Sequence, residues 1–264
     1  LKRMWFSNGI YHHYGCEKFV PDFSSDYLRM VIDHTDKSLI PLKDNETIDC
    51  FCDEIFPVIF DPSVLPKRVN KADKQDLVTT SACNYYENLT QEEVEKFYND
   101  MKDGADESMP SYGLNSKLVK RDGSIVECKW TETGMYGPAI SHIIYWLEKA
   151  RDEAENEQQK KIISILTEYY RTGDLRTFDS FSIEWLKETE GRVDFINGFI
   201  EVYGDPLGLK ASWEGFVSYK DIEATRRAQT ISDNAQWFED NSPIDPRFKK
   251  KEVKGVIANV VCAA

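Results

Sequence analysis

One stretch of the sequence, residues 193–219, constrains the fold most, because it holds the densest run of apolar, aromatic and glycine residues in the chain. Residues 193–203 are rich in β-branched and aromatic side chains and predict a buried strand, in which Gly198 marks a bulge or a close approach of another segment. The Gly-Asp-Pro-Leu-Gly segment at 204–208 predicts a turn. Residues 213–219 predict a second strand, so the chain is expected to contain a sheet.

Four polar residues interrupt these apolar strands: Asp194, Asn197, Glu201 and Glu214. A carboxylate or an amide on a half-buried strand needs hydrogen-bonding partners, because burial without them costs free energy. These side chains are therefore either a hydrogen-bonded scaffold or part of a binding site. Their spacing favours the scaffold without deciding the question.

Apolar periodicity and capping residues predict several helices around these strands. Thr90 and Glu93 form the pattern of a capping box, which predicts that a helix begins there and runs to about residue 102. Pro138 fits the first turn of another helix. The expected helices span residues 23–33, 90–102, 138–150, 162–170 and 220–239, with a further short one that is capped by Asp179 or Ser180.

Three other segments predict non-helical structure. Residues 114–130 predict a hairpin that turns at Lys-Arg-Asp-Gly, residues 120–123. Residues 37–69 contain four prolines and predict a surface excursion without a helix. Residues 253–264 are apolar and suggest a final strand.

Two motifs in the chain resemble the dipeptidyl peptidase III family, in particular its bacterial branch. The first lies on the predicted strands, where GFIE at 198–201, Tyr203, DP at 205–206, Gly208 and EGFV at 214–217 are similar to the family's GFIE-x-Y-x-DP-x-G and EGFV runs. The second lies near the start. There Phe-Ser-Asn at 6–8, Tyr14-Gly15 and Lys-Phe-Val-Pro at 18–21 resemble the family's YSN, FG and KFVP segments.

The resemblance implies an α+β fold: a mixed helical lobe with a partial antiparallel sheet or barrel, forming one lobe of a two-lobed peptidase. It assigns residues 1–219 to an incomplete non-zinc, substrate-binding lobe. It assigns residues 220–264 to a helix and linker that lead into a truncated zinc lobe. The missing initiator methionine and the ragged ends also suggest an excised part. The complete enzyme would use zinc to remove dipeptides from the amino end of short peptides.

The same resemblance names four substrate-binding candidates. Tyr14 and Gly15 fall where the family lines its substrate cleft. Asp194 falls where an acidic residue of the family meets the free amino terminus of the peptide, and a carboxylate suits an ammonium group. The position of the family's carbonyl-contacting tyrosine falls on Ile196, which cannot donate a hydrogen bond, so that role is given to no residue. Asn197 remains a binding candidate.

The zinc motif of the family, HExxGH, does not occur in the sequence, and none of the four histidines precedes a glutamate. We therefore expect no catalytic residue and no metal ligand in this chain, and zinc only in the parent enzyme. His12 and His13 are adjacent, so their side chains diverge and do not readily chelate one ion. His142 lies among apolar residues and is expected to be a packed, hydrogen-bonded histidine. The chain alone should not cleave peptides.

Composition limits the partners. A net charge of −13 excludes nucleic-acid backbones and anionic membrane surfaces, because both require a basic face. The expected partners are a short peptide and the missing zinc lobe of the same polypeptide. Six scattered cysteines are expected to be free and mostly buried, which favours a reducing, cytoplasmic location, although a removed leader is not excluded. The alternative function is a non-catalytic peptide-binding or interaction domain.

Overall fold

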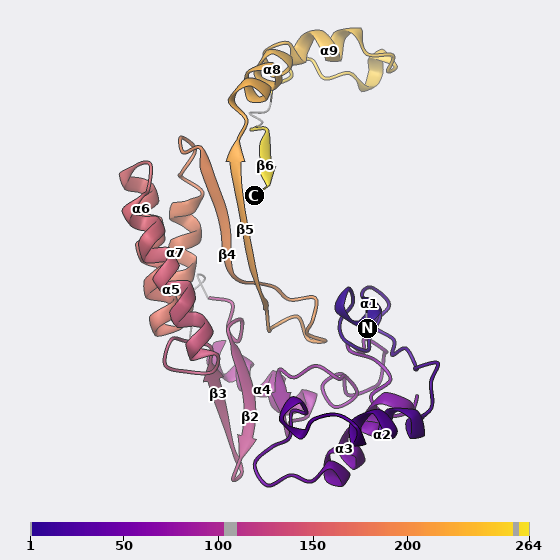
Figure 1. Cartoon of the computed structure of the whole chain (residues 1–264). Helices are drawn as coiled ribbons and strands as arrows, with labels where there is room; N and C mark the ends of the chain where they lie inside the picture. Colours follow the sequence, from indigo (N-terminus) through magenta and orange to yellow (C-terminus); the bar gives the residue numbers. More distant parts are fainter. Residues whose placement is uncertain (1, 103–109, 256–258, 264) are drawn as a thin grey trace. The chain divides into compact units, whose positions relative to one another are not determined.

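The computed structural model describes residues 2–102, 110–255 and 259–263. The chain divides into two compact units, each described by itself below. Unit 1 comprises Leu1–Trp130 and Glu201–Ser212, and unit 2 comprises Thr131–Ile200 and Trp213–Ala264 (Figure 1). Both units combine helices with a small sheet, so the α+β prediction is confirmed.

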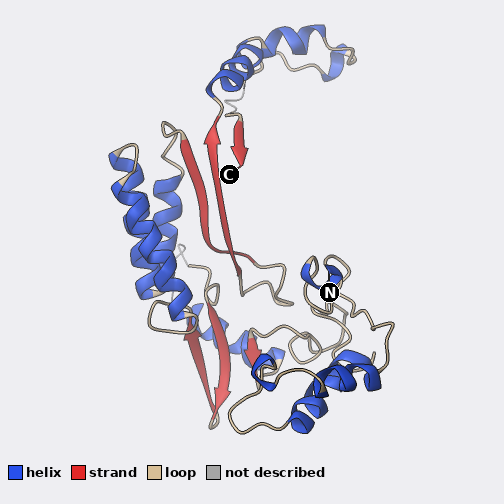
Figure 2. Cartoon of the chain, viewed as in Figure 1, coloured by secondary structure: helices blue, strands red, loops and turns tan. Residues whose placement is uncertain are grey.

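Unit 1 contains a three-stranded sheet in the order β1-β2-β3 (Figure 2). Strand β1 is parallel to β2, and β2 is antiparallel to β3. The elements of this unit are α1 (Lys2–Trp5), α2 (Ser25–Asp33), the 3-10 helix η1 (Lys37–Leu39), α3 (Ile48–Phe60), β1 (Tyr86–Glu87), α4 (Gln91–Lys102), β2 (Ser116–Arg121) and β3 (Ser124–Lys129).

The hairpin formed by β2 and β3 confirms the predicted one. Arg121 pairs with Ser124, so only Asp122 and Gly123 form the turn. Both have positive φ, 48° and 78°, the combination that a two-residue type I′ turn requires. Glycine adopts this conformation without strain, so the sequence of the turn sets the register of the two strands.

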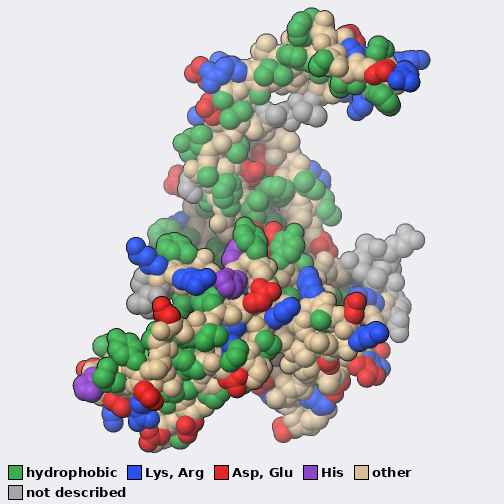
Figure 3. Space-filling model, turned by 90° about the vertical axis from the view of Figure 1, so that its right-hand side faces the viewer, with side chains coloured by type: hydrophobic (Ala, Val, Ile, Leu, Met, Phe, Trp, Pro, Cys, Tyr) green, Lys and Arg blue, Asp and Glu red, His purple; other side chains and the backbone are tan. Residues whose placement is uncertain are grey.

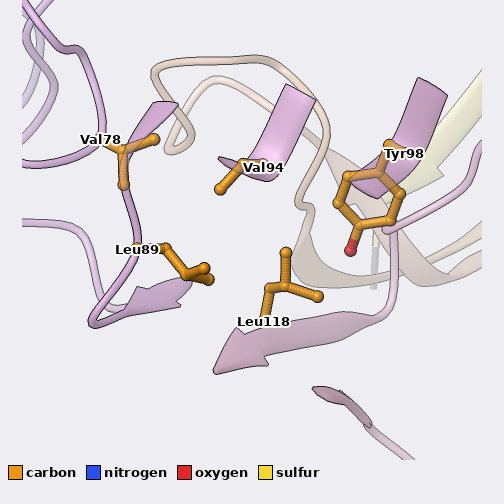
Figure 4. Close-up of a cluster of buried hydrophobic side chains, with 5 residues drawn as sticks. All are labelled: Val78, Leu89, Val94, Tyr98 and Leu118. Atoms are coloured by element: carbon orange, nitrogen blue, oxygen red, sulfur yellow. The ribbon is translucent and has the colours of Figure 1, made fainter. Parts of the chain in front are cut away.

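The core of unit 1 lies between α4 and β2 and is drawn in Figure 4. Helix α4 begins as predicted, because Thr90 Oγ1 accepts a hydrogen bond from Glu93 N at 3.3 Å and Glu93 Oε2 accepts one from Thr90 N at 3.0 Å. The capped helix then places apolar side chains on the sheet. The buried cluster consists of Val78, Leu89, Val94, Tyr98 and Leu118.

Helix α3 contradicts the prediction that residues 37–69 contain no helix. Thr47 caps it by accepting a hydrogen bond from Cys50 N at 3.2 Å. Pro57 lies inside the helix and removes only the backbone bond to the carbonyl of Asp53. The helix continues to its end because Asp61 N donates to Pro57 O at 3.0 Å. The prediction rested on the four prolines, and one exposed proline does not break the helix.

Unit 2 packs three helices beside a sheet in the order β4-β5-β6 (Figure 1). Helix α6 contacts both α5 and α7. The elements are α5 (Gly137–Asp152), α6 (Glu157–Thr172), α7 (Leu175–Trp185), β4 (Val193–Glu201), β5 (Ser212–Lys220), α8 (Ile222–Asp233), α9 (Ala235–Asn241), the 3-10 helix η2 (Pro246–Phe248) and β6 (Val261–Ala263). The first residue of β5 and the last of β4 belong to unit 1.

Two helix boundaries in unit 2 differ from the prediction. The cap of α7 is Asp174, which accepts a hydrogen bond from Arg176 N at 3.1 Å, and not Asp179 or Ser180. Gly173 ends α6 in the left-handed conformation, so the chain can start the next helix after a single residue. The helix predicted over residues 220–239 is two helices, because the backbone leaves helical geometry at Asn234.

Strands β4 and β5 form where they were predicted, but the expectation that β4 is buried was wrong. Side chains alternate along a strand, and Phe195 and Phe199 face the rings of α7 and α6. The alternate residue Ile196 is 40% exposed. Gly198 shows the predicted close approach, since a Cβ there would lie 2.9 Å from the ring of Phe178. Helices therefore cover one face of β4 within unit 2.

The six cysteines are free, and Cys52 alone among them is buried, so the expectation of mostly buried thiols was wrong. Over the part of the chain that the structure describes, no helix combines the length and the apolar character needed to cross a bilayer.

Candidate functional site

Unit 2 contains an apolar groove of about 740 Å³ between α5 and the strands β4 and β5. Aromatic rings form much of its lining, and a few polar groups lie among them. The residues that define the groove here are His142, Trp146, Phe195, Asn197, Trp213 and Phe216. Hydrophobic side chains also reach the surface at several places among charged ones on the face drawn in Figure 3. A groove of this size and lining suits an apolar ligand whose orientation is set by a few polar contacts.

A chain of hydrogen bonds fixes Asn197 in this groove. Trp213 Nε1 donates to the Tyr170 hydroxyl at 2.8 Å, and that hydroxyl lies 2.6 Å from Asn197 Oδ1. Because an indole nitrogen only donates, the Tyr170 hydrogen must go to Asn197, and the acceptor must be its amide oxygen. Burial raises the pKa of Tyr170 and keeps its hydroxyl protonated. The amide NH₂ of Asn197 is thereby turned to the other side of the side chain.

Asp194 is exposed at the start of β4, beside the groove-lining residues Val193 and Phe195. One oxygen of its carboxylate is held in place: Oδ1 accepts from Trp185 Nε1 at 2.9 Å and from Phe195 N at 2.7 Å. The other carboxylate oxygen, Oδ2, takes no part in these two bonds and can interact with a ligand. Asp194 and Asn197 therefore have the partners that the scaffold interpretation requires, and they are bonded to different helices, α7 and α6.

The other two predicted site residues, Tyr14 and Gly15, lie in unit 1. Tyr14 is 93% exposed, and its ring packs against the edge of the neighbouring His13 ring, with centroids 4.6 Å apart. Gly15 leaves room for the carboxylate of Glu17, which a Cβ at Gly15 would approach to 2.1 Å. An exposed aromatic ring beside accessible backbone suits an extended peptide, but Tyr14 and Gly15 belong to a different unit from Asp194 and Asn197.

A buried ionic cluster in unit 1 was missed by the sequence analysis. Lys210, directly after the DP-x-G run, has no exposed surface and donates from Nζ to the Tyr98 hydroxyl and to Ser116 Oγ. Glu127 Oε1 lies 4.0 Å from Nζ and accepts hydrogen bonds from both hydroxyls, at 2.8 Å and 2.7 Å. Burial lowers the pKa of Lys210 to about 8. The sequence around Lys210 contains no pattern that predicts the burial of this lysine.

Asp205 of the DP-x-G run is also fully buried and holds the same loop in shape. Its Oδ2 accepts from Leu209 N and from Lys210 N, each at 2.8 Å, and from the Tyr86 hydroxyl at 2.7 Å. Gly208 permits the turn with a φ of 67°. The motif that carried the resemblance thus has a structural role at these positions.

His142 is exposed and lines the groove, so the prediction of a packed histidine was wrong. It lies on the outer side of α5, whereas Ile140 and Ile144 are buried. Within the described ranges, no three His, Cys, Asp or Glu side chains gather in an arrangement that could hold a metal ion.

Comparisons with known proteins identify the family of this chain. A sequence profile described as peptidase family M49 matches residues 67–255. The chain belongs to peptidase family M49. This match includes the strand motif at 198–217 and the three hydrogen-bonded residues of the groove, Trp213, Tyr170 and Asn197. The predicted resemblance to dipeptidyl peptidase III is confirmed by the relatives described next.

The dipeptidyl peptidase 3 of Dictyostelium discoideum is 26% identical over 267 residues, which cover 92% of this chain and 36% of that protein. The human dipeptidyl peptidase 3 is 27% identical over 117 residues, 44% of this chain and 16% of that protein. An Arabidopsis thaliana protein named Nudix hydrolase 3 is 27% identical over 146 residues, 55% of this chain and 18% of that protein. The chain thus spans about a third of the Dictyostelium relative.

Among solved structures, DPP III from Caldithrix abyssi is similar to this M49 chain with a TM-score of 0.50 and 16% identity. The likeness covers 86% of this chain and 40% of that one. At this identity it shows a shared fold and does not carry over residue roles. The two fold units therefore lie within a known peptidase architecture.

Proposed function

We propose that this chain is the substrate-binding part of a zinc-dependent dipeptidyl peptidase and that unit 2 binds the amino-terminal end of a short peptide. The observation that carries the proposal is the exposed Asp194 carboxylate, which is oriented by Trp185 Nε1 and Phe195 N and is next in sequence to groove-lining Val193 and Phe195. Membership of family M49 supports a peptide as the ligand.

Each group has a distinct part in this binding. The Asp194 carboxylate receives the peptide's ammonium group, and the charge on both partners strengthens the hydrogen bond. The amide NH₂ of Asn197, turned away from Tyr170, donates to a main-chain carbonyl of the peptide. The aromatic lining of the groove, which includes Trp146 and Phe216, takes apolar side chains of the ligand. Because recognition of the amino terminus fixes the register, it sets which peptide bond is cleaved.

The zinc of the family would polarise the scissile carbonyl and activate water. Among the described residues no three His, Cys, Asp or Glu side chains gather around a site for that ion, and the sequence lacks HExxGH, so we assign its ligands to the part of the polypeptide that the Dictyostelium relative has in addition. This assignment keeps residues 1–219 in the substrate-binding lobe and residues 220–264 at the junction to the zinc lobe. We also propose that the product is a dipeptide, because recognition of the amino terminus fixes which peptide bond is cleaved. The free cysteines support a cytoplasmic location.

Calorimetric titration of the chain with a tetrapeptide tests the proposal. Asp194→Asn keeps an oxygen for Trp185 and removes the charge, so we expect at least about tenfold weaker binding. Asp233→Asn is the matched control in the same unit, because Asp233 bonds only to Gln229 on its own helix and should bind as the wild type does. Equal affinity of both variants would refute the role of Asp194.

A hydrolysis assay with a dipeptidyl-naphthylamide and added zinc complements this titration. The proposal predicts no turnover by the chain alone, because its residues do not form the zinc site. Turnover that depends on zinc would show that ligands were overlooked. It would overturn the assignment of catalysis to another part of the polypeptide.

The groove itself favours a second candidate, a non-catalytic interaction domain. Trp146 is 67% exposed and Phe216 is 46% exposed, which is a large apolar surface for one unit. A domain of that kind would bind peptides equally well with a free or a blocked amino terminus, whereas the peptidase proposal requires the ammonium group.

A further inference from the structure

Arg68 of unit 1 has a charge that no neighbour neutralises. Within the described residues it forms no ion pair, and its guanidinium meets only Cys16 Sγ, at 4.0 Å. Its Nε is buried and has no hydrogen-bond partner. Buried donors are nearly always paired, so an unpaired guanidinium nitrogen calls for an explanation. In a chain with a net charge of −13, an arginine without a carboxylate partner is unexpected.

Arg68 lies close to both segments that carry the family resemblance, the one near residues 14–21 and the one at 198–208. Arg68 N donates to Cys16 O at 2.8 Å, which attaches it to the turn that contains Tyr14 and Gly15. Its Nη1 lies beside Gly204, directly before the Asp205-Pro206 motif. All of these residues belong to unit 1. Arg68 thus links two segments that are far apart in the sequence.

The backbone of Gly204 packs closely against the guanidinium of Arg68. A Cβ at Gly204 would lie 3.2 Å from Arg68 Nη1 and 3.1 Å from the Tyr85 hydroxyl. Its φ is not positive, so the backbone conformation does not require glycine there. The absence of a side chain instead allows this close approach, and Arg68 itself stays half-buried, so part of its side chain reaches solvent.

We propose that Arg68 binds a carboxylate, the carboxy-terminal group of a short peptide. A guanidinium presents paired N–H donors in one plane, which match the two oxygens of a carboxylate. This inference rests on the proposed function, since a peptide ligand is what supplies such a group. It gives the protein a preference for peptides whose carboxy terminus is free.

The test uses the whole chain with arginine labelled with ¹⁵N, and an N-acetylated tripeptide as the probe. This probe has no ammonium group, so its binding does not depend on Asp194. We expect the tripeptide acid to shift the Arg68 Nε–H resonance saturably, and the matching tripeptide amide to bind about tenfold more weakly. The resonance is assigned by its loss in Arg68→Lys.

Two variants sharpen the test. Arg68→Gln should bind the acid and the amide equally weakly. Gly204→Ala should weaken the acid more than the amide, because its methyl group occupies the space beside Nη1. Equal binding of acid and amide to the wild type, or no binding of either, overturns the inference. If free tetrapeptides still depend on Asp194 in that case, the proposed function stands while the Arg68 site fails.

Discussion

The buried cluster around Lys210 in unit 1 and the Trp213–Tyr170–Asn197 chain in unit 2 use polar side chains in opposite ways. In unit 1, Lys210 and its partners satisfy one another and leave no surface for a ligand. In unit 2, the chain of hydrogen bonds ends at an amide whose second group faces a groove. The lowered pKa of Lys210 therefore marks a buried scaffold residue and not a ligand site.

A shifted pKa alone would select Lys210 as the functional residue, although it is part of the scaffold. Perturbed titratable groups often mark functional sites, but ion pairs of the scaffold perturb pKa values as well. Lys210 has no exposed surface, and burial lowers its pKa although the charges of Glu127 and Asp205 oppose the shift. Asp194 is exposed and fixed by two donors, which are the properties that a ligand-binding carboxylate needs.

The largest expected effect is the removal of the acid in the buried cluster. Glu127→Ala leaves the ammonium of Lys210 without its counter-charge and two hydroxyls, of Tyr98 and Ser116, without their acceptor. We expect a loss of about 3 kcal/mol or more in the free energy of unfolding, measured by urea denaturation at pH 7.

Glu54→Ala is the matched control, since Glu54 pairs with Lys43 at the surface of the same unit. Both side chains of that pair are well exposed, and its removal should cost less than about 1 kcal/mol. Similar losses for the two variants would show that the cluster around Lys210 is not a stabilising feature of the fold.

The second prediction concerns pH. The pKa of Lys210 is about 8 in the folded chain and about 10.5 when unfolded, so below pH 8 the lysine is charged in both states and burial penalises the fold. Between pH 8 and 10.5 the unfolded state binds more protons, and stability must rise with pH. The difference is worth about 3 kcal/mol.

Lys210→Met provides the control for this effect. It removes one partner of the buried pair and leaves the Glu127 carboxylate without the neighbouring ammonium, so it should be less stable than the wild type at pH 7. It should lose the rise above pH 8. Burial raises the pKa values of Tyr86 and Tyr98, so both proteins should lose stability above about pH 10, where unfolded tyrosine ionises. A wild type without the rise would contradict the burial of a protonated Lys210.

A smaller effect is expected in unit 2. Tyr170→Phe removes the hydroxyl that links Trp213 to Asn197, leaving an indole N–H and an amide oxygen unpaired. We expect a loss of about 1 to 2 kcal/mol in unfolding free energy and weaker tetrapeptide binding, because Asn197 is no longer oriented. Tyr145→Phe, at an exposed tyrosine of α5, should change neither quantity. Unchanged binding by Tyr170→Phe would remove Asn197 from the site.

Features set by neighbouring residues were predictable from the sequence. The β2–β3 hairpin follows from Asp122-Gly123, and the start of α4 follows from the capping pair Thr90 and Glu93. Strands β4 and β5 of unit 2 follow from their apolar runs. In each case the deciding interactions lie within a few residues of one another, where spacing is informative.

Features set by distant packing were not predictable. Helix α3 forms around Pro57 because a single missing backbone bond is tolerated on its exposed side. Lys210 meets Tyr98 and Glu127 only after the chain has folded, so its burial left no local pattern. Asp194 was placed by the family resemblance, but its partner Trp185 on α7 appears only in three dimensions.

The most direct measurement compares a tetrapeptide that has a free amino terminus with its N-acetylated form, both titrated calorimetrically into the wild-type chain. If Asp194 receives the ammonium group, acetylation should weaken binding by at least about tenfold, and Asp194→Asn should abolish that difference. Equal affinity for the two peptides would contradict recognition of the amino terminus and would favour the interaction domain instead.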